Sequence, residues 1–310
     1  MRVKALGSAA GGGFPQWNCG CSNCSRLRVG VLKGQKRTQA EVAISPEPGS
    51  WLLLNASPDL RQQISQDPEF FPTEQTRSTP IAAVILTSAD VDSVLGLLHL
   101  REFQPLRIYA TASVRRVLTE ENTLFRALER SVPPVHWEDL PLDRATRVFQ
   151  SSTHGSDASL VCTAIALGGE FPDYVSERLR KSLPAAEAVI GLAFVQNGKQ
   201  LFFAPTLPGR ESEWKQRAAA SDVALLDGTF WTDRELIDVR GGGKTAREIG
   251  HVPLSGAGGL LEQMRDARDL RRILIHLNNT NPALDEESAA YRALQDAGWE
   301  IAYDGMEFEL

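Results

Sequence analysis

The stretch Ile85–Leu98 reads ILTSADVDSVLGLL, and we expect the fold to be built around it. An apolar, partly β-branched run predicts a strand, which the polar segment Thr87–Ser93 stops abruptly. Apolar residues in Val94–Leu100 then recur at helical spacing. The turn between strand and helix carries Asp90 and Asp92. Two carboxylates that a strand and a helix hold in place are suited to a hard or borderline metal ion.

The simpler interpretation of these aspartates is that one of them caps the following helix, because acidic side chains are favoured at that position. Taken alone, the stretch favours the cap over the metal ligand. Other segments support the metal. An apolar strand ends at Asp227, a second is followed directly by His276, and His251 comes just after a helix and Gly250.

The 310 residues suffice for one large domain or two small ones. With 42% hydrophobic and 23% charged residues, the chain has the composition of an ordinary globular protein. Its net charge of −6 and its short basic clusters argue against a nucleic-acid partner. Because the chain contains no evident repeat, low-complexity tract or convincing linker, we predict a single domain over residues 1–310.

No apolar run approaches the roughly 20 residues that span a bilayer, so we expect no membrane partner. The N-terminal MRVKALGSAAGGGF has the basic start of a signal peptide but lacks its apolar central region. We therefore predict a cytoplasmic protein.

Three of the four cysteines form the motif Cys19-x-Cys21-x-x-Cys24, whereas Cys162 lies alone in an apolar run. In a reducing compartment such a cluster indicates a metal site more often than a disulfide framework. Zinc is the usual ion of sulfur-rich structural sites. We predict a zinc knuckle at about residues 14–28 whose fourth ligand comes from elsewhere. The alternative is three unligated cysteines in a loop, and Cys162 is expected to be a buried small side chain.

Two glycine-rich segments resemble nucleotide-binding loops but lack the required spacing. We expect the first, residues 7–13, to let backbone pass close to a site or to another loop. The dipeptide Asn197-Gly198 between two apolar runs predicts a hairpin. The polar segment 168–185 is either a lid over a site or a surface crossover, which is the commoner case at that length.

Taken together, these features resemble the metallo-β-lactamase superfamily. The resemblance implies an α/β (α+β) fold, a four-layer αββα sandwich with metals at one edge. The superfamily motif at the turn is H-x-H-x-D-H, and the same register here reads Ser88-Ala-Asp90-Val-Asp92-Ser93. Only the aspartate at position 92 is retained.

Within the superfamily, the chain is similar to the family that acts in biosynthesis of the redox cofactor pyrroloquinoline quinone (PQQ). The resemblance covers nearly the whole chain. It depends on LGSAAGGGFPQWNC at 6–19, the cysteine motif, Arg37-Thr38-Gln39, LLNASPD at 53–59, residues 97–102, LLDGT at 225–229, Gly250-His251, HLNNTNP at 276–282 and YDGM at 303–306. That family keeps an Asp-His pair where this chain has Asp92 and Ser93.

The resemblance places His276 at the last metal histidine of the superfamily. It makes His251 either a second ligand or a proton donor, and Asp227 either a ligand or a group that orients a histidine. His99 is not expected to replace the missing histidine, because it lies about 10 Å along the helix from Asp92. We interpret His136 and His154 as surface residues.

Two histidines and one carboxylate form a facial triad, which suits non-haem iron(II) and oxygen. His251, His276 and either Asp90 or Asp92 could supply one. The resemblance implies an iron-dependent oxygenase that hydroxylates the tyrosine of a cross-linked Glu–Tyr precursor. The alternatives are a non-catalytic carrier of PQQ or its precursor, which Ser93 makes credible, and a two-metal hydrolase such as a phosphodiesterase. Other proteins of the pathway and a second copy of the chain are partners that the sequence leaves open.

Overall fold

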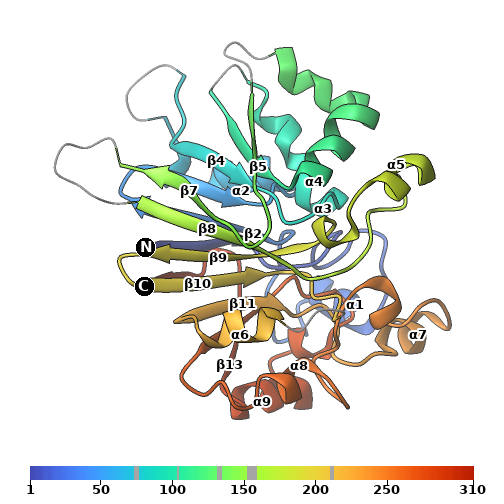
Figure 1. Cartoon of the computed structure of the whole chain (residues 1–310). Helices are drawn as coiled ribbons and strands as arrows, with labels where there is room; N and C mark the ends of the chain where they lie inside the picture. The colour runs from blue at the N-terminus through green and yellow to red at the C-terminus, as the bar shows by residue number, and fades with distance from the viewer. Residues whose placement is uncertain (73–76, 103–104, 131–134, 152–158, 210–212) are drawn as a thin grey trace.

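Two seven-stranded β-sheets lie face to face, and helices cover both outer faces (Figure 1). The computed structural model describes residues 1–72, 77–102, 105–130, 135–151, 159–209 and 213–310. This arrangement confirms the four-layer αββα sandwich expected from the sequence. The two chain ends lie side by side, because the first strand of the chain pairs antiparallel with the last.

The first sheet has the order β14-β1-β2-β3-β4-β5-β6, and the second has the order β13-β12-β11-β10-β9-β8-β7. The strands of the first are β1 (Arg2–Gly7), β2 (Glu41–Glu47), β3 (Ser50–Leu54), β4 (Ile81–Ile85), β5 (Arg107–Ala110), β6 (His136–Asp139) and β14 (Glu307–Glu309). Those of the second are β7 (Ala145–Gln150), β8 (Ser159–Ala166), β9 (Ile190–Gln196), β10 (Lys199–Ala204), β11 (Val223–Asp227), β12 (Arg271–Ile275) and β13 (Trp299–Ile301).

The helices are short and mostly connect strands. They are α1 (Ser22–Arg28), α2 (Leu60–Gln66), α3 (Val91–Val94), α4 (Ala112–Arg116), α5 (Glu177–Ser182), α6 (Glu213–Ala219), α7 (Glu235–Arg240), α8 (Leu260–Gln263) and α9 (Ala289–Asp296). Two 3₁₀ segments, η2 (Leu95–Leu100) and η4 (Thr123–Arg130), and the π-helical turn η3 (Val117–Glu121) matter for the site below.

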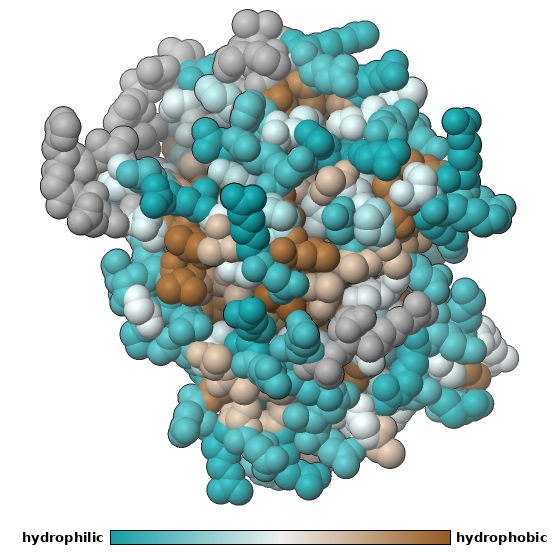
Figure 2. Space-filling model, viewed as in Figure 1, coloured by the Kyte–Doolittle hydropathy of each residue, from teal (hydrophilic) through white to brown (hydrophobic). Residues whose placement is uncertain are grey.

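Alternate side chains of the central strands face two different apolar clusters. In β3, Leu52 and Leu54 belong to a cluster drawn from strands of both sheets, whereas Leu53 belongs to the cluster that also contains the helices. Strands that are buried on both faces appear in the sequence as continuous apolar runs. Cys162 lies in the cluster between the sheets, as predicted. On the face seen in Figure 2, hydrophilic side chains cover most of the surface and apolar ones form smaller patches.

The hairpin prediction is confirmed, because β9 and β10 are joined by Asn197 and Gly198 with φ values of 52° and 77°. The helix expected after the Ile85–Leu98 turn is shorter than predicted, since α3 gives way to the 3₁₀ segment η2. The backbone at Gly96 packs directly against that of Ser57. Only glycine fits there, because a Cβ at this position would lie 2.2 Å from the Ser57 carbonyl oxygen.

The interpretation of the turn aspartates as simple caps is wrong. Asp90 occupies the N-cap position of α3, but its side chain makes no capping hydrogen bond and accepts instead from the Ser88 hydroxyl at 2.7 Å. Asp59 before α2 behaves similarly and accepts from the Gln39 backbone N–H at 2.9 Å. In both cases a second polar group competes for the carboxylate, so that the side chain turns away from the helix.

Three histidines were not expected to be metal ligands, and two of them, His136 and His154, were interpreted as surface residues. His99 is exposed on η2, and His136 is exposed on β6, where its Nε2 lies 3.0 Å from Glu138 Oε1. His154 lies outside the described residues. No helix in the described parts of the chain is long and apolar enough to cross a membrane.

Candidate metal centres

Asp227, the last residue of β11, is fully buried at the base of the first candidate centre. Its Oδ1 accepts hydrogen bonds from the backbone N–H and the hydroxyl of Thr229, at 2.9 and 2.6 Å. Its Oδ2 accepts from the Leu207 N–H and lies 2.8 Å from His251 Nδ1. A carboxylate offers about four acceptor positions, so these contacts occupy all of them. Asp227 is therefore held rigidly beside His251.

The His251 ring follows a short 3₁₀ turn and Gly250, whose φ of 87° reverses the chain towards the site. Because Nδ1 faces Asp227, Nε2 is the nitrogen left for a ligand. The ring stacks on that of His276 with 5.6 Å between centroids, and Phe230 packs edge-on against it at the same centroid distance. These contacts fix the orientation of the imidazole.

His276 follows β12 and has a φ of 63°, which is uncommon for a residue other than glycine. Its Nδ1 lies 2.9 Å from the Thr229 hydroxyl, and its Nε2 lies 2.9 Å from Asp92 Oδ2. Residues in such conformations gather at functional sites, where the surrounding structure holds them. The backbone of His276 is thus bent so that its ring faces the turn that follows β4.

In the turn, the Asp92 side chain lines the cleft, whereas the Ser93 side chain is buried and is not among the residues that line it. The Ser93 hydroxyl is buried and lies 3.4 Å from the Ser88 hydroxyl, so this position supplies no nitrogen to the cleft. A Cβ on Gly11 would lie 3.5 Å from Asp92 Oδ2, which places the glycine-rich loop directly beside the carboxylate. The expectation that this loop passes close to a site is confirmed.

The buried charges of the centre shift one another's pKa values. Burial alone would raise the pKa of Asp227 and of Asp92, but the neighbouring histidines outweigh it and lower both. Burial would likewise lower the pKa of His276, yet the hydrogen bond with Asp92 raises it. Asp90 differs, because burial and the charge of Asp92 both raise its pKa. Asp92 is therefore the better of the two metal-ligand candidates.

Two histidines and two carboxylates supply possible metal ligands here, and of these Asp227 is already held by four hydrogen-bonding contacts. Ligand atoms of Asp227, His251 and His276 all lie within 4.8 Å of one another. Two ligands bound at about 2.1 Å and about 90–110° would be about 3.0–3.4 Å apart, close to the 2.9 Å between His276 Nε2 and Asp92 Oδ2. The structure thus pairs Asp227 with His251 and Asp92 with His276, whereas Asp90 is paired with Ser88.

The centre lies in a cleft of about 580 Å³. Asp90, Asp92, His251 and His276 line it together with Gly11 and Gly12 of the glycine-rich loop. The segment from Gly169 to Asp173 forms another part of its wall, so the beginning of the segment predicted as a lid or crossover does border the site.

The second candidate centre is the cysteine motif. The sulfur atoms of Cys19, Cys21 and Cys24 lie within 4.8 Å of one another. The side-chain amide of Asn279 approaches all three, with Nδ2 at 3.1, 3.5 and 3.4 Å from the respective sulfurs. Rotation of the amide by 180° would present its oxygen to an ion bound there. Three thiolates and one amide oxygen make the four donors of a closed tetrahedral site.

Sequence reasoning missed two residues of these centres. The sequence left the fourth ligand of the cysteine centre open, because the spacing of the cysteines says nothing about which distant segment brings Asn279 to them. Thr229 holds both Asp227 and His276: its hydroxyl donates to Asp227 Oδ1 and lies 2.9 Å from both Nδ1 and the carbonyl oxygen of His276. The sequence signal that could have identified Thr229 was its position two residues after Asp227, where its hydroxyl can reach the aspartate at the end of the strand.

Comparison with known proteins agrees with this geometry. Residues 50–277 match the beta-lactamase superfamily domain, which makes the protein a member of that superfamily. "Coenzyme PQQ synthesis protein B" of Azotobacter vinelandii and of Azoarcus sp. are each 40% identical to it, over the full length of both chains. The chain belongs to the coenzyme PQQ synthesis protein B (PqqB) family.

Solved structures extend the comparison. The crystal structure of Zn²⁺-bound PqqB from Methylobacterium extorquens is 37% identical, covers all of both chains and superposes with a TM-score of 0.89. A diphosphatase of the PhnP family, 15% identical, covers all of this chain and 97% of its own with a TM-score of 0.66. At that identity the second likeness concerns the fold alone. The first is a relative that binds zinc.

Proposed function

We propose that this protein acts in PQQ biosynthesis as a metal-dependent oxygenase that hydroxylates the tyrosine of a Glu–Tyr-derived precursor. Membership of the PqqB family supports the pathway. The observation that carries the chemistry is the convergence of His251, His276 and Asp92 on one cleft. Two histidines and one carboxylate with open positions are the donor set of non-haem iron(II) oxygenases.

In this proposal His251 Nε2, His276 Nε2 and Asp92 would hold the ion, and iron(II) would supply the activation of oxygen. The other residues prepare the ligands. Asp227 accepts from His251 Nδ1 and so fixes its tautomer, which raises the basicity of the free nitrogen. Thr229 does the same for His276 by bonding its Nδ1. In the alternative assignment, His251 would not bind the ion, and its Nε2 would instead donate a proton to a substrate in the cleft.

The cysteine centre is proposed as a structural zinc site, with Asn279 as its fourth donor. All three sulfurs point at one place, and burial raises the pKa of Cys24 to about 11, so only an ion would keep this thiol deprotonated at neutral pH. A reducing compartment keeps such thiols available, and on this ground we also propose a cytoplasmic location.

A non-catalytic carrier of PQQ or its precursor is the second candidate function. The observation that favours it is Ser93, because a centre with one histidine fewer binds a metal less tightly. A hydrolase with two metals has less support, since the first pair of motif histidines is also replaced, by Ser88 and Asp90. Metal content separates the three functions: one iron, no metal beyond the zinc, or two zincs in the cleft.

The test is elemental analysis of protein purified without oxygen, compared with His276→Ala and with His99→Ala as the matched control. His99 is exposed and remote from both centres, so its loss should change nothing. We expect about one zinc per chain in all three proteins. The unaltered protein and His99→Ala should also hold about one iron per chain, which His276→Ala should lack. If no protein retains iron, even after iron(II) is added back, the oxygenase is excluded and the carrier becomes the leading function.

A further inference from the structure

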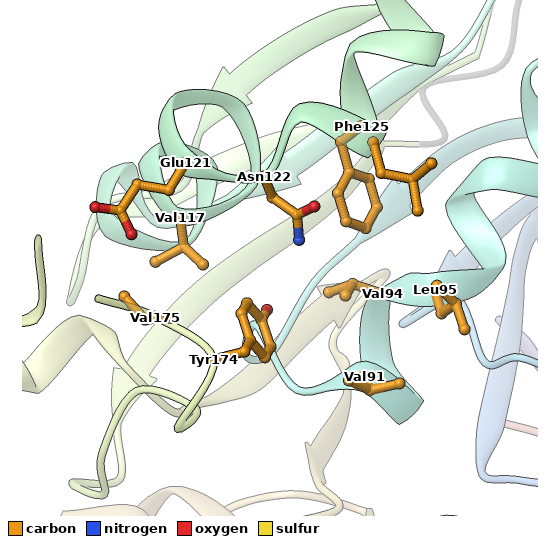
Figure 3. Close-up of a pocket in the computed structure, with 10 residues that line it drawn as sticks. Val91, Val94, Leu95, Val117, Glu121, Asn122, Phe125, Tyr174 and Val175 are labelled. Carbon is orange, nitrogen blue, oxygen red and sulfur yellow. The ribbon is translucent and has the colours of Figure 1, made fainter. Parts of the chain in front are cut away.

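A second hollow adjoins the metal cleft, and nothing in the proposed chemistry uses it. Its volume is about 410 Å³. Residues of α3, η2, η3, η4 and the segment before α5 surround it: Val91, Val94, Leu95, Val117, Glu121, Asn122, Leu124, Phe125, Tyr174 and Val175 (Figure 3). We call it the Val91–Tyr174 pocket.

The lining of this pocket is predominantly apolar, including at its rim. Val91, Leu124 and Tyr174 are 53%, 58% and 44% exposed, which is unusual for large apolar side chains. Phe125 and Val117 are buried beneath them. Single exposed apolar residues need no explanation, but several that gather around one hollow mark an interaction site. The rings of Phe125 and Tyr174 suit an aromatic occupant, since ring pairs gain attraction beyond the area they bury.

Two polar side chains border the pocket, and they differ in availability. The Glu121 carboxylate is occupied, because it accepts from the backbone N–H and the hydroxyl of Ser176. The Asn122 side chain points into the space between Val94 and Tyr174 (Figure 3). Among the described residues it has no hydrogen-bond partner. A predominantly apolar pocket with one free polar group is the usual design of a small-molecule site, where the polar group sets orientation.

The pocket shares a wall with the metal cleft. Val91 lines both spaces and stands between Asp90 and Asp92 in the chain. On the opposite segment Asp173 faces the cleft and Tyr174 faces the pocket. The Tyr174 hydroxyl donates to the Ala89 carbonyl, which ties the two segments together. A molecule in the pocket would therefore lie beside the cleft, across Val91 from it.

We propose that the Val91–Tyr174 pocket binds an aromatic ring bearing one hydrogen-bonding substituent, as a ligand site beside the cleft and distinct from the place where the substrate ring reacts. Apolar walls and two aromatic rings select the ring, and the Asn122 amide selects its substituent. A cavity of about 150 Å³ already accepts benzene, so 410 Å³ accommodates a substituted ring. This proposal goes beyond the proposed function and depends only on the chemistry of the pocket.

The experiment measures binding of p-cresol and of toluene to the full-length protein with its zinc retained and no iron added, by ligand-observed NMR titration. Both probes carry the same ring, and only p-cresol has a hydroxyl. We compare the unaltered protein with Asn122→Leu and Leu124→Ser, and with Val239→Ser as the control. Val239 is 47% exposed on α7 and does not line the pocket. Near-ultraviolet circular dichroism confirms the fold of each variant.

We expect p-cresol to bind more tightly than toluene to the unaltered protein. Asn122→Leu should weaken p-cresol about fivefold, the loss of roughly one hydrogen bond, and leave toluene unchanged. Leu124→Ser should weaken both probes, and Val239→Ser neither. Failure of the probes to bind, or equal binding to all four proteins, overturns the proposal. Because no iron is added, the pocket can be confirmed while the iron analysis fails, and the two results remain separable.

Discussion

The cysteine centre surrounds one point with four donors, whereas the donors in the cleft form two hydrogen-bonded pairs, Asp227 with His251 and Asp92 with His276. In the first, Cys24 and Asn279 are buried, and Cys19 and Cys21 are half-buried. In the second, His251 and His276 line a cleft of about 580 Å³. Closed four-donor sites are typical of structural zinc, and sites with open positions are typical of catalysis. This difference supports the structural role proposed for the cysteine centre and the catalytic role proposed for the cleft.

The two centres nevertheless share one segment, residues 276–281. His276 enters the cleft at its first position, and Asn279 reaches the cysteines three residues later. Asn23, in α1 between two of the cysteines, donates to the carbonyls of Asn279 and Asn281 at 3.2 and 2.9 Å. An ion bound among the thiols, as proposed, would therefore stabilise the same loop that places His276.

The largest expected effect comes from removing one thiol. Cys24→Ser should abolish zinc retention and lower the free energy of unfolding by about 4 kcal/mol or more, because a closed metal site contributes folding energy directly. Zinc analysis and urea denaturation measure it. Cys162→Ser, also buried but outside the motif, is the control and should keep its zinc. Retention of zinc by Cys24→Ser would contradict the closed site.

The pH dependence of metal affinity should differ between the centres. Burial raises the pKa of Cys24 to about 11, so binding at neutral pH must displace its proton. Apparent zinc affinity should then rise about tenfold per pH unit per proton released, up to the highest pH at which the protein is folded. In the cleft Asp92 and Asp227 have lowered pKa values, so at neutral pH these carboxylates release no protons when a metal binds. Affinity there should rise only until the pH passes the raised pKa of His276.

Calorimetry in buffers of different ionisation enthalpy counts these protons. Titrating the unaltered protein and His276→Ala with zinc isolates the contribution of each centre, since only the cysteine centre is intact in the variant. If zinc affinity changed equally with pH in the two proteins throughout pH 6–9, the two centres would not differ in the number of protons that they release.

A smaller effect is expected from Asp227→Asn. An amide cannot accept from both Thr229 and His251 in the same way, so the imidazole loses its fixed tautomer, and affinity for the cleft metal should fall about 10–100-fold. Anaerobic iron titration measures it. Asp173→Asn is the control, because Asp173 lines the cleft with a fully exposed side chain and contacts no ligand. A loss confined to Asp173→Asn would show that cleft charge, not ligand orientation, determines affinity.

The smallest effect concerns the shared loop. Asn23→Ala leaves two buried carbonyls without their side-chain donor, which should cost about 1–3 kcal/mol of stability. If the loop couples the centres, affinity for the cleft metal should also fall, by about two- to fivefold. The measurements are urea denaturation and iron titration of the same sample. Full stability loss with unchanged iron affinity would mean that the centres are independent.

Much of this protein follows from local sequence. Alternation of apolar runs with turns predicted the strands, Asn197-Gly198 predicted the hairpin, and the cysteine spacing predicted three thiols at one place. These signals depend on a few neighbouring residues, whose backbone preferences act over one turn or one strand. The strand ends that carry Asp227 and His276 were visible for the same reason.

Tertiary structure alone decided which of these groups meet. Asp227 and His276 are 49 positions apart in the chain, and they become neighbours because β11 and β12 run parallel side by side. Asp92 comes from the other sheet, so its pairing with His276 depends on how the two sheets pack. Asn279 reaches the cysteines because the 276–281 loop folds back towards α1. Such contacts between distant segments are set by burial of the whole core, which no local pattern encodes.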